Sequence, residues 1–151
     1  MDILEFDNKM ELKFSAKSAN ESFARVAIAA FISQLNPTIA EVTEVKTAVS
    51  EAVTNAIIHG YDSDINQQVF LSCFLTGNSA EIIIKDLGQG IEDINLAREA
   101  LYTSKPEMER SGMGFTIMEE FMDAVEIISK PNEGTTIIMT KNFEQNKEKL
   151  I

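Results

Sequence analysis

The sequence predicts an α+β fold, a two-layer sandwich in which a mixed β-sheet carries helices on one face. The 151 residues are one domain's worth of chain, and 44% of them are hydrophobic, enough to bury a core without cross-links. Segments of strand and helix periodicity follow one another as strand, two helices, two strands, one or two short helices, two strands. Because the helices come in blocks and do not alternate singly with strands, this order disfavours a doubly wound fold.

The first predicted strand is Met10–Ser15, where apolar and polar residues alternate. Ser18 and Glu21 have the spacing of a capping box, which predicts a helix running to about Leu35. We expect Asn36-Pro37 to end this helix. Its apolar stripe is predicted to comprise Phe23, Val26, Ala27, Ala30 and Phe31.

A second, longer helix is predicted over Thr38–His59, with Thr38 as its cap and Glu41 three residues further on. Gly60 is expected to end it. The residues predicted to face the core are Val42, Val45, Val49, Ala52, Val53 and Ala56.

Two hairpins make up the rest of the predicted sheet. Their strands are Gln68–Leu75, Glu81–Lys85, Ala124–Ser129 and Thr135–Lys141. Between the hairpins we expect at most a short helix within Ile91–Leu101, a mobile segment from Tyr102 to Gly114 and a short helix over Phe115–Met122. The single domain, residues 1–151, thus has a core of about residues 10–141 and a frayed tail over residues 142–151.

Charge and cysteine content exclude several classes of function. The formal net charge of −11 opposes binding to nucleic acid or to an anionic membrane surface. The single cysteine, Cys73, excludes an internal disulfide and a cysteine-built metal cluster, in keeping with a cytoplasmic protein. The N-terminus does not resemble a secretion signal, and no apolar run is long enough to span a membrane.

The second predicted helix carries Glu51, Asn55 and His59 at steps of four, within an arc of about 80°. An amide carbonyl such as that of Asn55 is a hard oxygen ligand that suits Mg²⁺. Glu51, one turn earlier, could accept a proton from an attacking hydroxyl. The alternative is a solvated helix face. His59 has no second histidine or cysteine near it, so zinc is not supported.

Asp86, Gly88 and Gly90 follow a strand that ends in three isoleucines. A carboxylate at a strand end can accept a hydrogen bond from an exocyclic amine such as that of adenine, and the glycines let the backbone approach a flat ring or a phosphate. An ordinary glycine-rich turn is the alternative. The pattern is not the dinucleotide-binding fingerprint, because no long helix follows.

The segment Arg110-Ser111-Gly112-Met113-Gly114-Phe115 leads into the next predicted helix. Exposed amides at a helix start favour an anion, and Lys105 and Arg110 add positive charge in an otherwise acidic chain. This combination indicates a triphosphate site, although the P-loop pattern is absent. A flexible surface loop with a glycine hinge is the alternative.

Taken together, these motifs and Gly134-Thr135-Thr136 resemble the N, G1, G2 and final boxes of the GHKL ATPases, which include gyrase, MutL and histidine kinases. Within that superfamily the stretches 20–25, 50–61 and 103–119 resemble the sporulation anti-sigma serine kinases of endospore-forming bacteria. The likeness runs from about Met10 to Lys141 and implies the Bergerat ATP-binding fold.

The resemblance also implies a role for each motif residue. Glu51 is the expected catalytic base, Asn55 the Mg²⁺ ligand, and Asp86 the acceptor for the adenine amine, helped by Thr135. Gly88 and Gly90 are expected to shape the adenine pocket. The segment from Tyr102 to Gly114 is the expected ATP lid, and its nucleotide-binding residues are Lys105, Arg110, Ser111, Gly112, Met113 and Gly114.

For function, the resemblance implies an anti-sigma factor that binds the sporulation sigma factor F. With Mg-ATP it is expected to phosphorylate a serine of an anti-anti-sigma protein. Arg25 on the first helix is a candidate partner contact, and the strand Met10–Ser15 could pair across the two-fold axis of a homodimer. The alternatives are a general stress-type anti-sigma kinase, an ATP-gated sigma-binding module without kinase activity, and the ATP-binding half of a histidine kinase. The last is disfavoured because no phosphoacceptor-histidine helix precedes the domain.

Overall fold

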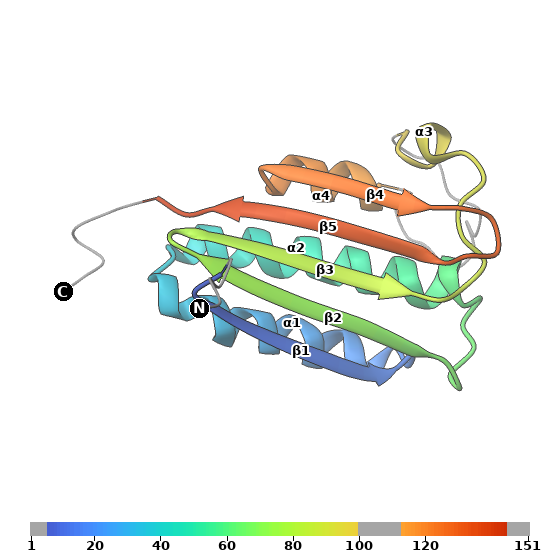
Figure 1. Cartoon of the computed structure of the whole chain (residues 1–151), viewed down its shortest axis with the longest axis horizontal. Helices are drawn as coiled ribbons and strands as arrows, with labels where there is room; N and C mark the ends of the chain where they lie inside the picture. Colours follow the sequence, from blue (N-terminus) through green and yellow to red (C-terminus); the bar gives the residue numbers. More distant parts are fainter. Residues whose placement is uncertain (1–5, 100–112, 145–151) are drawn as a thin grey trace, which may run out of the picture.

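The computed structural model describes residues 6–99 and 113–144. They form a five-stranded sheet with helices on one face (Figure 1). The strand order is β1-β2-β3-β5-β4, and all four neighbouring pairs run antiparallel. All strand boundaries lie within two residues of those predicted from the sequence. The strands are β1 (Asn8–Ser15), β2 (Gln68–Thr76), β3 (Ser79–Asp86), β4 (Ala124–Ser129) and β5 (Thr135–Asn142).

The expectation of a mixed sheet is therefore wrong, and the connections explain why. Two helices separate β1 from β2 in the sequence. The chain runs along the sheet once in each helix and then enters β2, which pairs with β1 in the opposite direction. β3 and β4 do run parallel, but β5 lies between them and pairs with both. No parallel pair of neighbours remains in the described part of the sheet.

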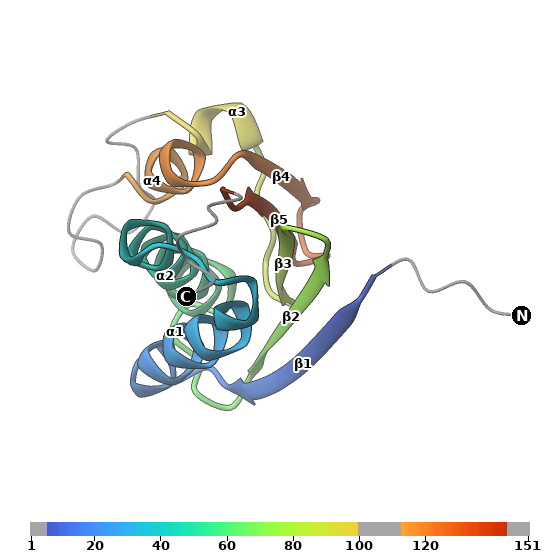
Figure 2. The same ribbon diagram turned by 90° about the vertical axis from the view of Figure 1, so that its left-hand side faces the viewer.

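The second layer contains α1 (Ala19–Ile32), α2 (Ile39–Asn55) and α4 (Gly114–Phe121), which lie on the same side of the sheet (Figure 2). A short helix, α3 (Ile94–Ala97), lies near the β4 edge. The two-layer α+β architecture is thus confirmed. Its core lies between the layers and includes Ile28, Ile32, Val45, Val49, Val53, Leu71, Ile82, Ile84, Met118 and Met139.

Of the two predicted capping boxes, only that of α2 forms. The Glu41 N–H donates to Thr38 Oγ1 at 3.1 Å, and the Thr38 N–H donates to Glu41 Oε1 at 2.8 Å. The box predicted at α1 is wrong, because Ser18 already has helical backbone angles and its side chain makes no cap bond. The Glu21 N–H donates to the Ser18 carbonyl oxygen instead, so no orphan donor is left there for the hydroxyl.

The apolar stripe predicted for α1 is wrong in its first residues, although Phe31 does pack against the core. Phe23 is 53% exposed and Val26 is 61% exposed, whereas Ala24, Ile28 and Ile32 face the core. Apolar side chains surround most of this helix between residues 23 and 32, so their periodicity could not select the buried side.

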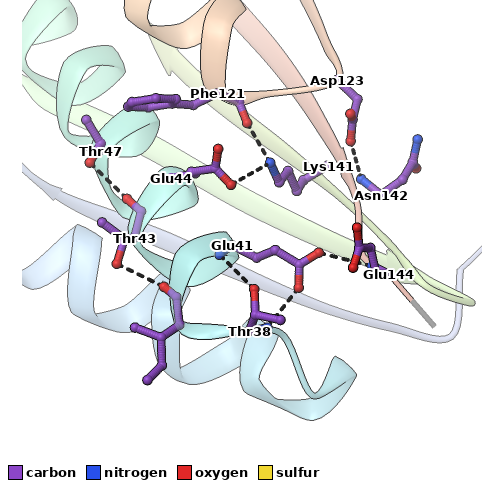
Figure 3. A network of polar contacts seen from close by, with 11 residues as sticks. Thr38, Glu41, Thr43, Glu44, Thr47, Phe121, Asp123, Lys141, Asn142 and Glu144 are labelled. Atoms are coloured by element: carbon purple, nitrogen blue, oxygen red, sulfur yellow. Dashed lines mark hydrogen bonds and ion pairs between the residues drawn. The ribbon is translucent and has the colours of Figure 1, made fainter. Parts of the chain in front are cut away.

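The start of the predicted tail is anchored in the fold (Figure 3). β5 extends to Asn142, Phe143 is buried, and the Glu144 N–H donates to Glu41 Oε2 at 3.0 Å. Only residues 145–151 of the predicted tail lie outside the described residues.

Lys141 joins three elements at this same end of the molecule (Figure 3). Its ammonium group donates to the carbonyl oxygen of Phe121 at 2.7 Å and pairs with the Glu44 carboxylate at 3.3 Å. The C-terminal end of α4 is thereby fixed to α2 and β5.

Candidate functional site

The predicted adenine-binding residues come together at the opposite end of the sheet, where β3 ends and β5 begins (Figure 1). Asp86 and Thr135 are register partners on these neighbouring strands, so their side chains project from the same face. Both are buried, with 3% and 5% of their surface exposed. A carboxylate and a hydroxyl thus share the helix-covered face of the sheet at this end.

The second predicted helix changes character as it reaches this end. It is α-helical to Asn55 and continues as a π-helix over Ala56–Gly60, with the Tyr61 N–H donating to the Ala56 carbonyl oxygen at 2.9 Å. Short π-helical segments are frequent at functional sites. Here the segment carries the chain from Asn55 to a close contact between Gly60 and Asp86.

Two glycines leave the space that the Asp86 carboxylate occupies. A Cβ atom on Gly60 would lie 2.6 Å from Cγ of Asp86, closer than Cβ contacts in proteins. A Cβ atom on Gly88 would lie 1.9 Å from the Gly60 carbonyl oxygen. The sequence predicted Gly88 in the site but assigned Gly60 only to the helix end. Gly90, also predicted, has φ +74° and passes close to the Lys130 backbone.

Burial dominates the electrostatics of Asp86. Desolvation raises the pKa of its carboxyl group to about 6, against the opposing effect of hydrogen bonds from the backbone N–H groups of Gly88 and Thr135. The Gly88 bond is 2.9 Å long. At neutral pH the group is a buried carboxylate, an acceptor suited to an amine of a bound ligand.

The Thr135 hydroxyl belongs to a small network at the start of β5. Ser129 Oγ donates to the Gly134 carbonyl oxygen at 3.0 Å and accepts from the Ile91 N–H at 2.8 Å. Because the single Ser129 hydrogen is used in this way, Thr135 is the donor in the 2.9 Å contact between the two hydroxyls. The lone pairs of Thr135 Oγ1 can then accept a hydrogen bond from a ligand.

Sequence reasoning did not predict that Gly60 and Tyr61 hold the loop after β3. The Gln89 N–H donates to the Gly60 carbonyl oxygen at 2.9 Å. Tyr61 is buried; its hydroxyl donates to the Gln68 carbonyl oxygen at 2.6 Å and accepts from the Leu87 N–H at 2.7 Å. The position of Tyr61, directly after Gly60, was the available signal, but the sequence does not reveal the partners of its hydroxyl.

Glu51 and Asn55 lie one turn apart near the C-terminal end of α2, and both are half-buried. Their neighbours Ala52, Val53 and Ala56 face the core, so the two polar side chains lie at the border of the buried face. α4 packs against this helix. The described residues contain no cluster of three or more histidine, cysteine or acidic side chains that could hold a metal ion. Mg²⁺ usually takes few protein ligands and completes its coordination with phosphates and water.

The predicted phosphate-binding segment is only partly described. Lys105, Arg110, Ser111 and Gly112 lie outside the described residues. Met113 stands at the N-cap position of α4, which begins at Gly114, and its side chain makes no cap hydrogen bond.

Arg25, the predicted partner contact, is partly exposed on α1. Its Nε atom lies 3.2 Å from Glu21 Oε2, and Nη2 donates to Ser22 Oγ at 3.2 Å. Glu21 also accepts a hydrogen bond from the Ser50 hydroxyl, which precedes Glu51 on α2. The guanidinium group is thus connected to the helix that carries the predicted base.

None of the helices in the described ranges has both the length and the apolar character needed to cross a membrane.

Comparisons with known proteins show the family to which this chain is similar. Residues 14–141 match the model of the histidine kinase-like ATPase domain. An anti-sigma F factor of Oceanobacillus iheyensis is 59% identical over 140 residues, which are 93% of this chain and 96% of the relative. An anti-sigma F factor of Clostridium perfringens is 60% identical over 137 residues, covering 91% and 98% of the two chains.

A solved structure shares the fold. The crystal structure of the RsbU and RsbW domains of a Mycobacterium tuberculosis protein superposes with a TM-score of 0.68 at 17% identity. The match covers 93% of this chain and 34% of that one.

Proposed function

Because this chain belongs to the anti-sigma F factor family, which carries a histidine kinase-like ATPase domain, we propose that it is an ATP-dependent serine kinase that also sequesters a sigma factor. Its proposed sigma partner is the sporulation sigma factor F, and its substrate is a serine of an anti-anti-sigma protein. It acts in the cytoplasm as a homodimer of single-domain protomers, with the core at about residues 10–141.

One observation carries the proposal for the nucleotide. A buried carboxylate, Asp86, is framed by Gly60 and Gly88 beside the Thr135 hydroxyl, at the same end of the molecule as Glu51 and Asn55. Burying an ionised group without a strong partner is costly, which suggests that a ligand amine completes the site. The exocyclic amine of adenine has this chemistry.

The remaining roles rest on the family resemblance, and the chemistry of the groups supports them. The Asn55 carbonyl holds Mg²⁺, which neutralises charge on the ATP phosphates when bound. The backbone amides of Met113 and Gly114, at the start of α4, bind phosphate together with Lys105, Arg110, Ser111 and Gly112. Gly90 shapes the pocket beside Gly88.

In the proposed transfer, Glu51 accepts the proton of the substrate serine hydroxyl. The serine oxygen forms a bond to the terminal phosphorus of ATP as the bond to the leaving ADP oxygen breaks. A domain that only binds ATP needs no base at this position. Arg25 contacts the protein partner from α1.

Incubation with γ-labelled ATP, Mg²⁺ and a candidate anti-anti-sigma protein tests the proposal. We expect label on a serine of that protein, and loss of at least 99% of the transfer rate with Glu51→Gln while ATP binding stays within about threefold. Glu126→Gln, on the outward face of β4, is the matched control and should retain full activity.

Three outcomes would contradict parts of the proposal. Tight ATP binding without transfer to any candidate would indicate an ATP-gated sigma-binding module. Transfer only to the partner of a stress-response sigma factor would indicate a general stress-type kinase. Full activity of Glu51→Gln would remove Glu51 as the base.

A further inference from the structure

The hydroxyl group of Tyr61 lies between two strands at the point where they separate. The β2–β3 ladder ends with Phe70 opposite Lys85, and the same register continued by two residues places Gln68 opposite Leu87. Tyr61 Oη occupies the place of the missing ladder bond, because it donates to the Gln68 carbonyl oxygen and accepts from the Leu87 N–H. One side chain thereby extends the pairing of β2 and β3 past the last strand residue, Asp86.

The bond to Leu87 acts directly on Asp86. The Leu87 N–H belongs to the planar peptide group that begins at the Asp86 carbonyl carbon, so fixing this N–H fixes the plane that follows Asp86. Packing cannot supply the same restraint, because the Leu87 side chain is 60% exposed.

The Tyr61 side chain is itself fixed in place by burial and by its neighbour Gly60. Its side chain is 7% exposed and starts from the residue after Gly60, whose backbone contacts the Asp86 carboxylate. The Gly60 carbonyl oxygen also accepts from the Gln89 N–H. Gly60 and Tyr61 therefore contact the turn from Asp86 to Gln89 at three of its residues, Asp86, Leu87 and Gln89, and hold its conformation.

We infer that Tyr61 is a positioning residue that makes the site selective for the 6-amino group of a purine, by holding the turn in which Asp86 presents its carboxylate. The inference rests on the proposed adenine site and assigns it a determinant that is not among the predicted site residues. A phenyl ring in this place keeps the packing but leaves the Leu87 N–H and the Gln68 carbonyl without their partner, so the turn can shift.

The test compares two nucleotides on the full chain: ATP, and purine riboside triphosphate, which has hydrogen in place of the 6-amino group. The wild-type protein should bind ATP at least tenfold more tightly than the analogue. In Tyr61→Phe we expect ATP affinity to fall about fivefold to tenfold, whereas affinity for the analogue changes less than twofold. The control is Thr38→Ala, which removes a polar contact at the far end of α2 and should leave the ratio of affinities unchanged.

The outcomes separate this inference from the proposal beneath it. No preference for ATP in the wild-type protein would overturn the adenine site, and with it the inference. A wild-type preference that Tyr61→Phe retains, or an equal loss for both nucleotides, would overturn the inference alone.

Hydrogen exchange in the nucleotide-free wild-type protein tests the same bond without relying on the variant to fold. The Leu87 amide should exchange at least a hundredfold more slowly than an unprotected amide, because its acceptor is a buried hydroxyl. Unprotected exchange of Leu87 would overturn the inference.

Discussion

Replacing Asp86 by asparagine should stabilise the nucleotide-free protein at neutral pH while it weakens adenine binding. The folded-state pKa of Asp86 is about 6, against an ordinary value of 3.8. Because the folded pKa is the higher one, the stability contribution of this group is full below pH 3.8, declines between pH 3.8 and 6, and is lost above pH 6. Asparagine is neutral throughout and does not show this decline.

The size of the effect follows from the same two values. The interval between 3.8 and 6 corresponds to at most about 3 kcal/mol in the free energy of unfolding. The asparagine oxygen can still accept from one of the two N–H groups that Asp86 binds, Gly88 or Thr135. Loss of the other bond offsets part of the gain equally at every pH, so it leaves the pH dependence unchanged. We therefore expect the stability difference between Asp86→Asn and wild type to rise by about 1–3 kcal/mol from pH 4 to pH 7.5.

Urea denaturation of both proteins without nucleotide, at several values between pH 4 and pH 7.5, measures this difference. The other titrating groups are common to both proteins and cancel. Adding ATP should reverse the ranking at pH 7.5, because it stabilises only the protein that binds it well. A stability difference that is flat, or that falls with rising pH, would refute the reasoning about the buried carboxylate.

Two pairs of substitutions test other features through the free energy of unfolding, measured by denaturation. Gly88→Ala should cost more than about 2 kcal/mol and abolish ATP binding, because its Cβ would lie 1.9 Å from the Gly60 carbonyl oxygen. Gly77→Ala, at a φ of +57° in open space, should cost only about 1 kcal/mol; equal costs would contradict the steric argument. Thr38→Ala should cost about 1 kcal/mol through loss of the capping box. Ser18→Ala should change stability by less than about 0.5 kcal/mol, and a larger loss would mean that Ser18 does cap α1.

The two capping boxes show how far local sequence patterns lead. Ser18 and Thr38 have the same spacing to a glutamate, yet only Thr38 has the extended backbone that lets its side chain reach back to the helix. Backbone angles at the cap depend on how the preceding segment enters the helix, which the spacing does not encode. The buried side of α1 was hidden for a related reason, because apolar residues on most of its surface fit several orientations.

The candidate site divides in the same way. The motif residues Asp86 and Gly88 could be chosen from the sequence because a carboxylate and a glycine after a buried strand have recognisable chemistry. Gly60 and Tyr61 could not, since their importance arises only when the end of one helix meets the end of a distant strand. The widening of the helix at Ala56–Gly60, which makes this meeting possible, has no simple sequence pattern.

The helical segment from Thr38 to Gly60 is continuous, and this continuity affects how the site can change when a nucleotide binds. In the proposed function, this one stretch of chain carries Asn55, the Mg²⁺ ligand, and five residues later Gly60, which lies beside the adenine-binding carboxylate. The distance between these two residues is set by the continuous helical backbone and does not depend on how separate elements pack together. Changes of shape between nucleotide states are accordingly expected on the α4 side of the site, while the distance between Asn55 and Gly60 stays constant.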